Sequence, residues 1–210
     1  SGLRGFESLP LRHLPASSSV PTTPHPDDLS GREVLLLGLG AFGGGAGCAR
    51  ALAQRGAKLT ISDLRSEQDL AESLATLEGI TFRAALGGHS EELFRRAEFV
   101  VVNPAVPEAS PWLEVAHAAG CVLTTEVNLA LRLVPQVPCV AITGTHGKSS
   151  TAALLSHMLR LIPGRTVLGG NLGGSLLEQV EGLGPEDQLV VELSSFQLER
   201  LDAPQAWPQV

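Results

Sequence analysis

From Glu33 onward, short apolar runs alternate with longer stretches in which apolar residues recur at every third or fourth position. Short runs bounded by glycine or polar residues are typical of buried strands, and the longer recurrence is typical of helices. The predicted strands are 33–37, 58–62, 80–84, 98–103 and 121–124, separated by predicted helices at 43–55, 66–77, 90–96 and 110–119. This alternation predicts an α/β fold in which helices cover both faces of a parallel sheet.

A second pattern of the same kind follows a predicted helix at 125–133 and the prolines Pro135 and Pro138. It holds predicted strands at 137–142, 165–168 and 188–193, and a predicted helix at 148–162 with its apolar residues on one face. Three strands are few for an independent α/β domain. We therefore expect a flexible leader at 1–30, a first α/β domain at 31–135, and the first part of a truncated second domain at 136–210.

Composition and charge narrow the range of partners. The formal net charge of −7 argues against nucleic acid and membrane surfaces, and no apolar run reaches the roughly 18–20 residues that span a bilayer. The three cysteines, Cys48, Cys121 and Cys139, form no CxxC pair, which favours free thiols in a reducing compartment. We expect a cytoplasmic monomer that binds small molecules.

The first glycine cluster follows the strand predicted at 33–37. Gly38, Gly40 and Gly43 fit the pattern GxGxxG at a strand-to-helix junction, and Asp63 lies 20 positions after Gly43. In this Rossmann-like pattern the first glycine permits a tight turn, the second lets a pyrophosphate approach the backbone, and the third lets helix and strand pack closely. Asp63 is placed to accept hydrogen bonds from a ribose or a base. The pattern alone also fits a nicotinamide-dependent dehydrogenase or a purely structural turn.

The second glycine cluster has the order of a P-loop: strand, glycine loop, Lys-Ser, helix. In such a loop the backbone N–H groups cradle phosphates, Lys148 neutralises the terminal phosphates, and the Ser149 hydroxyl ligates Mg²⁺. The general pattern GxxxxGK[ST] places its first glycine at position 142, where this chain has Ile142, so Gly144–Ser149 is a variant loop. An ordinary helix start capped by Ser149 or Ser150 explains neither Gly147 nor Lys148.

Three stretches resemble one known family. Gly144–Ser149 matches GTxGK[ST], the variant loop of the Mur ligase and folylpolyglutamate synthetase superfamily, and 169–173 is similar to that family's GGN[IL]G turn. The stretch 191–199, VELSSFQLE, resembles the branch that adds D-glutamate. The resemblance implies a Rossmann-like parallel-sheet domain followed by the start of a P-loop ATPase-like central domain. A dehydrogenase has no use for the second phosphate loop.

The resemblance also implies roles for individual residues. Lys148 and Glu192 would be catalytic, and Ser149 and Glu192 would ligate Mg²⁺. ATP would be bound by Gly144, Thr145, His146, Gly147, Lys148, Ser149 and Ser150. The UDP-linked substrate would be bound by Gly38, Gly40, Ala41, Phe42, Gly43, Asp63, Arg65, Asn171, Ser194 and Gln197.

The implied reaction joins D-glutamate to UDP-N-acetylmuramoyl-L-alanine with ATP, through an acyl phosphate, during peptidoglycan synthesis. Two departures from the family pattern leave alternatives open. Thr145-His146 is commoner in the branch that adds L-alanine, and Ala105 replaces the glycine of an SPG loop that flanks the uridine. A non-catalytic nucleotide-binding module is a further alternative, and we expect residues 1–210 alone to have no ligase activity.

Overall fold

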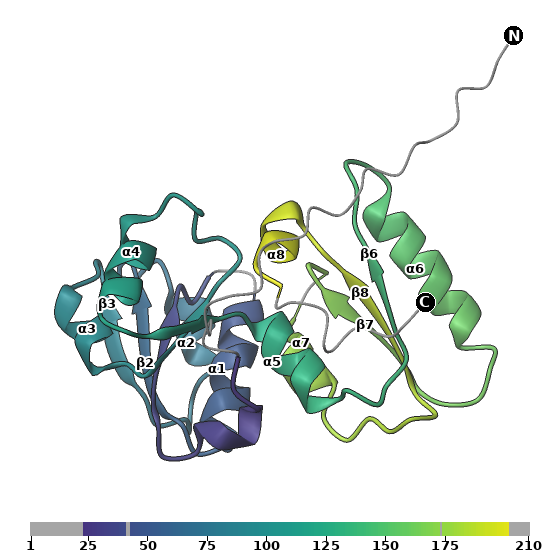
Figure 1. Ribbon diagram of the computed structural model, residues 1–210, viewed down its shortest axis with the longest axis horizontal. Helices are drawn as coiled ribbons and strands as arrows, with labels where there is room; N and C mark the ends of the chain where they lie inside the picture. The colour runs from purple at the N-terminus through teal and green to yellow at the C-terminus, as the bar shows by residue number, and fades with distance from the viewer. Residues whose placement is uncertain (1–22, 41–42, 173, 202–210) are drawn as a thin grey trace, which may run out of the picture.

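The structure is a computed structural model, and it describes residues 23–40, 43–172 and 174–201. Its helices and strands form two parallel sheets, one of five strands and one of three (Figure 1). Three helices, α1 (Gly44–Gln54), α5 (Glu126–Leu133) and α7 (Leu176–Gln179), lie between the two sheets. Within the described residues, no helix is both long and apolar enough to cross a membrane.

The five-stranded sheet is parallel throughout, with the order β3-β2-β1-β4-β5. Its strands are β1 (Glu33–Leu37), β2 (Lys58–Asp63), β3 (Arg83–Leu86), β4 (Phe99–Val102) and β5 (Val122–Thr124). The chain leaves β1 toward β2 and β3, then returns to place β4 and β5 on the other side of β1. The connections that follow β1 and β4 therefore diverge at the carboxyl ends of these strands, where open α/β sheets bind their ligands.

Helices cover both faces of this sheet, as the buried apolar runs of its central strands require. The helices are α1 (Gly44–Gln54), α2 (Ala71–Ala75), α3 (Glu91–Arg96), α4 (Pro111–Ala118) and α5 (Glu126–Leu133). Successive residues of β1 contribute to opposite faces: Leu36 packs in a core with α1 and α5, and Leu35 packs in a second core with Phe94 of α3. The five-stranded parallel sheet confirms the fold class predicted from periodicity.

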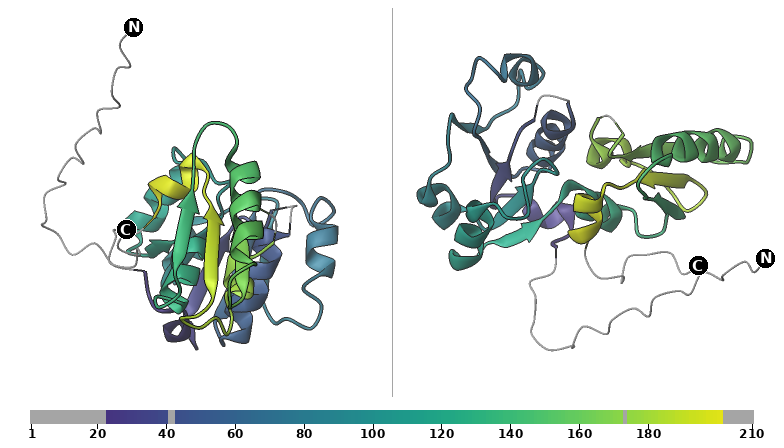
Figure 2. Two further views of the ribbon diagram at one scale, coloured as in Figure 1. Left: turned by 90° about the vertical axis from the view of Figure 1, so that its right-hand side faces the viewer. Right: turned by 90° about the horizontal axis from the view of Figure 1, so that it is seen from above.

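The three-stranded sheet has the order β6-β8-β7 and is also parallel. Its elements are β6 (Cys139–Ile142), α6 (Lys148–Leu159), β7 (Thr166–Gly170), α7 (Leu176–Gln179), β8 (Gln188–Glu192) and α8 (Ser195–Glu199). The central strand β8 is the most buried of the three. Viewed from the side and from above, α6 covers the face of this sheet that lies farthest from the five-stranded sheet (Figure 2).

The two sheets share one continuous apolar core, in which α7 fills the space between them. Leu176 and Leu177 of α7 are fully buried against residues of α1, α5 and β8. Glu126, at the start of α5, accepts hydrogen bonds from the Ser175 hydroxyl and from the Leu177 N–H at 3.0 Å. Because these contacts join elements far apart in sequence, the two sheets are held together by packing as well as by the chain.

Three predictions about local structure differ from what is observed. Residues 23–30, assigned to a flexible leader, contain a short 3-10 helix, η1 (Pro26–Leu29). Leu29 is fully buried in the core, and this packing holds the segment against the domain. The Thr23 hydroxyl also shares a 2.7 Å hydrogen bond with the hydroxyl of Thr124. Residues 1–22 lie outside the described residues, so the prediction of a flexible leader there stays a prediction.

The third strand and the long helix are the other two differences. The strand predicted at 80–84 is formed by Arg83–Leu86, and Ile80 and Phe82 pack against the core from the segment before it. Helix α6 buries Ala152 and Ser156, whereas Leu154 is 61% exposed. The face of α6 toward its sheet is centred on these two small residues, with Leu155 and Leu159 partly buried beside them, while Leu154 and Met158 point to solvent. The proposed domain boundary at 135/136 falls in the connection between α5 and β6 and stays a prediction.

Candidate functional site

The first glycine turn has backbone angles that favour glycine. Gly38, Gly40 and Gly43 have φ of 90°, 74° and 82°, in the left-handed region that other L-residues rarely adopt. Gly43 is the N-cap of α1, so the free N–H groups at the start of that helix follow directly after the turn. Ala41 and Phe42, predicted to bind the UDP-linked substrate, lie outside the described residues.

Gly43 was predicted to let α1 pack closely against its surroundings, but other glycines have this role. A Cβ on Gly43 would meet no atom within 4 Å, so Gly43 is needed for its φ and not for its size. A Cβ on Gly45 would lie 1.9 Å from the Leu39 carbonyl oxygen, and one on Gly47 would lie 2.4 Å from the Ser175 Cβ. The role of bringing the helix close to its surroundings therefore belongs to Gly45 and Gly47.

Asp63, at the end of β2, organises the first turn. One carboxylate oxygen accepts hydrogen bonds from the N–H groups of Leu39 at 2.9 Å and Gly40 at 3.2 Å. The other accepts from the N–H of Arg65 at 3.0 Å, and the Arg65 guanidinium also donates to the carboxylate. Burial alone would raise the Asp63 pKa, but the hydrogen bonds from Arg65 and Gly40 outweigh it and lower the pKa to about 2.

Asp63 and Arg65 thus make contacts within the protein, and their binding of the UDP-linked substrate stays a prediction. Asp63 is 6% exposed, and its hydrogen bonds hold the glycine turn in shape. The Arg65 side chain is 40% exposed, so part of its guanidinium remains accessible next to the turn. The sequence placed both residues beside the turn but could not show that they bond to each other.

The loop that follows β4 packs against the first glycine turn. Asn103 accepts a hydrogen bond from the Ala105 N–H at 2.9 Å through its side chain, and one from the Val106 N–H at 2.9 Å through its carbonyl. A Cβ on Gly38 would lie 3.0 Å from the Asn103 Cβ and 3.5 Å from a methyl of Val106. The residues 103–106 thus form a tight turn packed directly on the first glycine of the cluster.

The second glycine loop joins β6 to α6 and is exposed to solvent. Gly144 has φ of 145° and Gly147 has φ of 77°, and Gly147 is the N-cap of α6. Lys148, the first residue of the helix, folds back so that its Nζ donates to the Gly144 carbonyl at 2.9 Å. The predicted ATP-binding residues Thr145, His146, Ser149 and Ser150 are all exposed in or next to this loop.

Glu192 lies beside the second loop, at the end of the neighbouring strand. It is 1% exposed and pairs in register with Ile142, the last residue of β6. The Asn171 side-chain amide donates to one Glu192 carboxylate oxygen at 3.1 Å, and the Asn171 backbone N–H donates to the Glu192 backbone carbonyl at 2.8 Å. Asn171 and Glu192, which were predicted separately as a substrate-binding residue and a metal ligand, are in direct contact.

The second carboxylate oxygen of Glu192 is buried and has no hydrogen-bond partner in the described part of the chain. A buried polar atom without a partner carries a free-energy cost that a bound cation relieves. Mg²⁺ takes carboxylate and hydroxyl oxygens and completes its shell with water and phosphate. Glu192 fits such an ion, although the described residues contain no cluster of three or more His, Cys, Asp or Glu side chains that could hold a metal by themselves.

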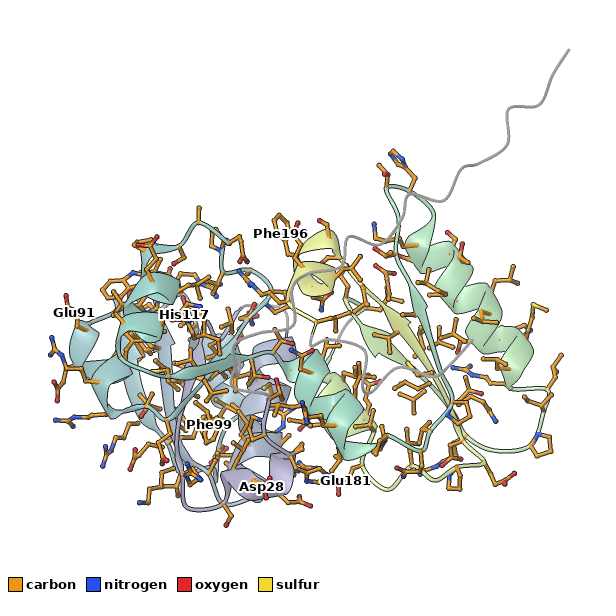
Figure 3. The ribbon with its side chains drawn as sticks, viewed as in Figure 1. Asp28, Glu91, Phe99, His117, Glu181 and Phe196 are labelled. Carbon is orange, nitrogen blue, oxygen red and sulfur yellow. The ribbon has the colours of Figure 1, made fainter. Side chains whose placement is uncertain are left out.

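Ser194 and Gln197, predicted to bind the substrate, form a reciprocal cap at the start of α8. The Ser194 hydroxyl accepts from the Gln197 N–H at 3.2 Å, and the Gln197 side-chain oxygen accepts from the Ser194 N–H at 2.9 Å. Gln197 is 4% exposed, whereas Phe196 is 52% exposed and projects from α8 at the surface (Figure 3). These contacts show a capping role, and a substrate role for Ser194 and Gln197 stays a proposal.

Helix α7 and its N-cap Ser175 were not predicted. The sequence Ser175-x-x-Glu178 is a capping signature, and the Ser175 hydroxyl does accept from the Glu178 N–H at 3.3 Å. That signature could have revealed the helix, although its four residues are too few for a periodic pattern. Arg200, which contacts the loop after β4, was also missed, because no pattern in the sequence marks a long-range ion pair.

Comparisons with known proteins agree with these features. A family model described as the Mur ligase MurD-like N-terminal domain matches residues 32–125. The chain is 46% identical over 182 residues to the UDP-N-acetylmuramoylalanine--D-glutamate ligase of Roseiflexus sp. (strain RS-1), a match that covers 87% of this chain and 39% of that relative. It is 45% identical over 172 residues to the ligase of the same name from Geobacter metallireducens, which covers 82% of this chain and 37% of the relative.

A solved structure shares the fold. The UDP-N-acetylmuramate:L-alanyl-gamma-D-glutamyl-meso-diaminopimelate ligase from Neisseria meningitides matches with a TM-score of 0.51 and 17% identity, over 77% of this chain and 52% of that one. The chain spans about two-fifths of the length of the two curated relatives named above. The chain belongs to the Mur ligase family, and its residues 32–125 match the MurD-like N-terminal domain.

Proposed function

We propose that this chain is part of a cytoplasmic, monomeric ligase that uses ATP to add D-glutamate to UDP-N-acetylmuramoyl-L-alanine in peptidoglycan synthesis. The observation that carries the proposal is the pairing of two strand-to-helix glycine turns within one packed unit. The first turn would hold the diphosphate of the sugar nucleotide, and the second would hold the triphosphate of ATP. The relatives' names support the choice of substrates.

The reaction needs charge cancellation at the second turn. The substrate carboxylate attacks the γ-phosphorus of ATP, which gives an acyl phosphate and ADP. The amine of D-glutamate then attacks the acyl carbon, phosphate leaves, and an amide remains. Negative charge builds up on the transferring phosphoryl group, and Lys148 at the start of α6 would stabilise it. The present bond from Lys148 to the Gly144 carbonyl keeps the ammonium group over the loop.

Residues Ser149 and Glu192 would hold Mg²⁺. When bound, the ion would offset the negative charge of the phosphate groups. Glu192 offers a buried oxygen that no described residue hydrogen-bonds, and the Asn171 side-chain amide fixes the other oxygen of the same carboxylate. Asn171 therefore acts as a positioning residue for Glu192 in this proposal.

The sugar nucleotide would lie across the carboxyl ends of β1 and β4. The N–H groups at the start of α1 would face the diphosphate, because helix starts favour anions. Asp63 would keep Leu39 and Gly40 in the right geometry, and Arg65 would present its exposed side to the uridine end. Ser194 and Gln197 would then lie toward the muramoyl-alanine end, close to the second turn.

Release of ADP by the complete protein tests the proposal. UDP-N-acetylmuramoyl-L-alanine is supplied with ATP, Mg²⁺ and either D-glutamate or another amino acid, and the product is identified by mass spectrometry. ADP release and amide formation are expected when the added amino acid is D-glutamate, and not when it is another amino acid. Turnover with UDP-N-acetylmuramate and L-alanine instead would assign the protein to the L-alanine-adding branch, which Thr145-His146 favours. No turnover with either pair would overturn the assignment.

A further inference from the structure

Arg200, just after α8, links the segment that follows β8 to the loop that follows β4. Its Nη2 donates to the Val106 carbonyl at 2.8 Å, and its Nε donates to a Glu108 carboxylate oxygen at 2.9 Å. The Arg200 side chain is 11% exposed, whereas the Glu108 side chain is 61% exposed. The bond to the Val106 carbonyl is therefore the more shielded of the two.

Arg200 is itself held in place from two directions. The Asn128 amide of α5 donates to the Arg200 carbonyl at 2.8 Å, and the Arg200 N–H donates to the Gln197 carbonyl at 3.3 Å. Gln197 belongs to the reciprocal cap with Ser194. The guanidinium thus projects from a fixed backbone toward the first sheet, and α8 lies between the two sheets (Figure 1).

The loop that Arg200 holds is the one packed on the first glycine turn. Val106 lies next to Gly38, and the 103–106 turn is closed by the bond from the Val106 N–H to the Asn103 carbonyl. A chain of direct contacts therefore runs from α8 through Arg200 and Val106 to Gly38. It connects the two ends of the region in which a substrate bound to both sheets would lie.

We propose that Arg200 is a positioning residue for the UDP-linked substrate. It fixes the loop after β4 against the glycine turn and sets the separation between that turn and α8. This inference rests on the proposed function, because it concerns the site assigned there to the sugar nucleotide. Arginine suits the task, since its planar group can donate to a carbonyl and a carboxylate at the same time.

The test compares variants of the complete protein. With Arg200→Gln, we expect KM and Kd for UDP-N-acetylmuramoyl-L-alanine to rise about tenfold, because a shielded hydrogen bond from a charged group is lost. The value of kcat and the KM for ATP are expected to stay within about twofold, since Lys148 and Glu192 are untouched. Arg200→Lys is expected to recover part of the loss, because an ammonium group can still donate to the Val106 carbonyl.

Two control variants test the exposed Glu108 contact of Arg200 and the loss of an unrelated surface arginine. Glu108→Gln removes the exposed partner and is expected to change KM less than about threefold. Arg96→Gln removes an exposed arginine on α3 that pairs with Glu92, and it is expected to leave kcat, both KM values and Kd unchanged. An unchanged KM in Arg200→Gln would overturn the inference. So would a joint loss of kcat, both KM values and thermal stability in Arg200→Gln and Arg200→Lys, because that result indicates a purely structural residue.

Failure of the proposed function gives a different result. If the wild-type protein does not ligate D-glutamate, the substrate assignment fails whatever Arg200 does. Calorimetric titration with UDP alone then still tests Arg200, because the glycine turn and the 103–106 loop belong to the nucleotide end. Wild-type binding of UDP with unchanged affinity in Arg200→Gln would overturn the positioning role by itself.

Discussion

The Arg50 guanidinium donates two hydrogen bonds to the Glu178 carboxylate, from Nε at 2.7 Å and from Nη2 at 3.0 Å. Arg50 lies on α1, which follows the first glycine turn, and Glu178 lies on α7, which follows the turn containing Asn171. Arg55, at the end of α1, also pairs with Glu181, which is labelled beyond α7 in Figure 3. The helix behind the first proposed phosphate site is therefore tied to the helix that follows the Asn171 turn.

Breaking this pair is expected to loosen the packing of α7 on α1. Arg50→Ala and Glu178→Gln should each lower the free energy of unfolding of the chain by about 1 kcal/mol, because the two side chains are each 30% exposed and only partly screened. The double variant should cost less than the sum of the two. Urea unfolding of the four proteins measures this, with Glu92→Gln as an exposed control on α3.

Equal and additive losses in the two variants would contradict a direct coupling between Arg50 and Glu178. So would a loss in Glu92→Gln as large as that in Glu178→Gln. That result would mean that any surface ion pair contributes as much as the one between α1 and α7.

Gly47→Ala is expected to destabilise the chain by about 1–2 kcal/mol. The new methyl group would lie 2.4 Å from the Ser175 Cβ, so α1 and α7 must move apart, and this cost exceeds the helix propensity that alanine gains. Gly44→Ala is the matched control in the same helix, because its Cβ would meet the Gly174 carbonyl oxygen at 3.5 Å, an ordinary contact. Equal unfolding midpoints for the two variants would contradict the tight α1–α7 contact.

Asp63 makes stability depend on pH in a defined range. Its pKa falls from 3.8 to about 2 in the folded chain, so its contribution is complete above about pH 5 and is lost as the pH falls through 3.8 toward 2. Asp63→Asn should therefore be less stable than the wild type by on the order of 1–2 kcal/mol at pH 6. The difference should shrink below pH 4, as urea unfolding at pH 6, 4 and 3 would measure. A difference that stays constant down to pH 3 would show that the carboxylate charge contributes nothing.

The strands of the first sheet, although not their order, could be predicted from the sequence because the central strands are continuous apolar runs. The run at 33–37 forms β1 with those bounds. Periodicity failed where apolar residues pack without joining a strand, as Ile80 and Phe82 do ahead of β3. It failed again on α6, where small residues face the sheet and Leu154 is exposed. Hydrophobicity reports burial, and burial alone does not decide which residues pair in a sheet.

The candidate site was only partly predictable for a related reason. Glycine positions with positive φ, such as Gly38 and Gly147, are visible in the sequence because only glycine adopts them easily. The partners of Asp63 and Gln197 are not visible, because a polar side chain next to a site can bond to a ligand or to the backbone around it. Both residues bond to the protein itself here.

The most direct test of two separate phosphate sites uses Lys148→Ala in the complete protein. Substrate-dependent ADP release and the Kd for UDP-N-acetylmuramoyl-L-alanine are measured side by side on the folded variant. Because Lys148 lies at the second turn only, ADP release should fall by a factor on the order of 1,000, while the Kd should stay within about threefold. Equal loss of ADP release and of substrate binding would contradict the account.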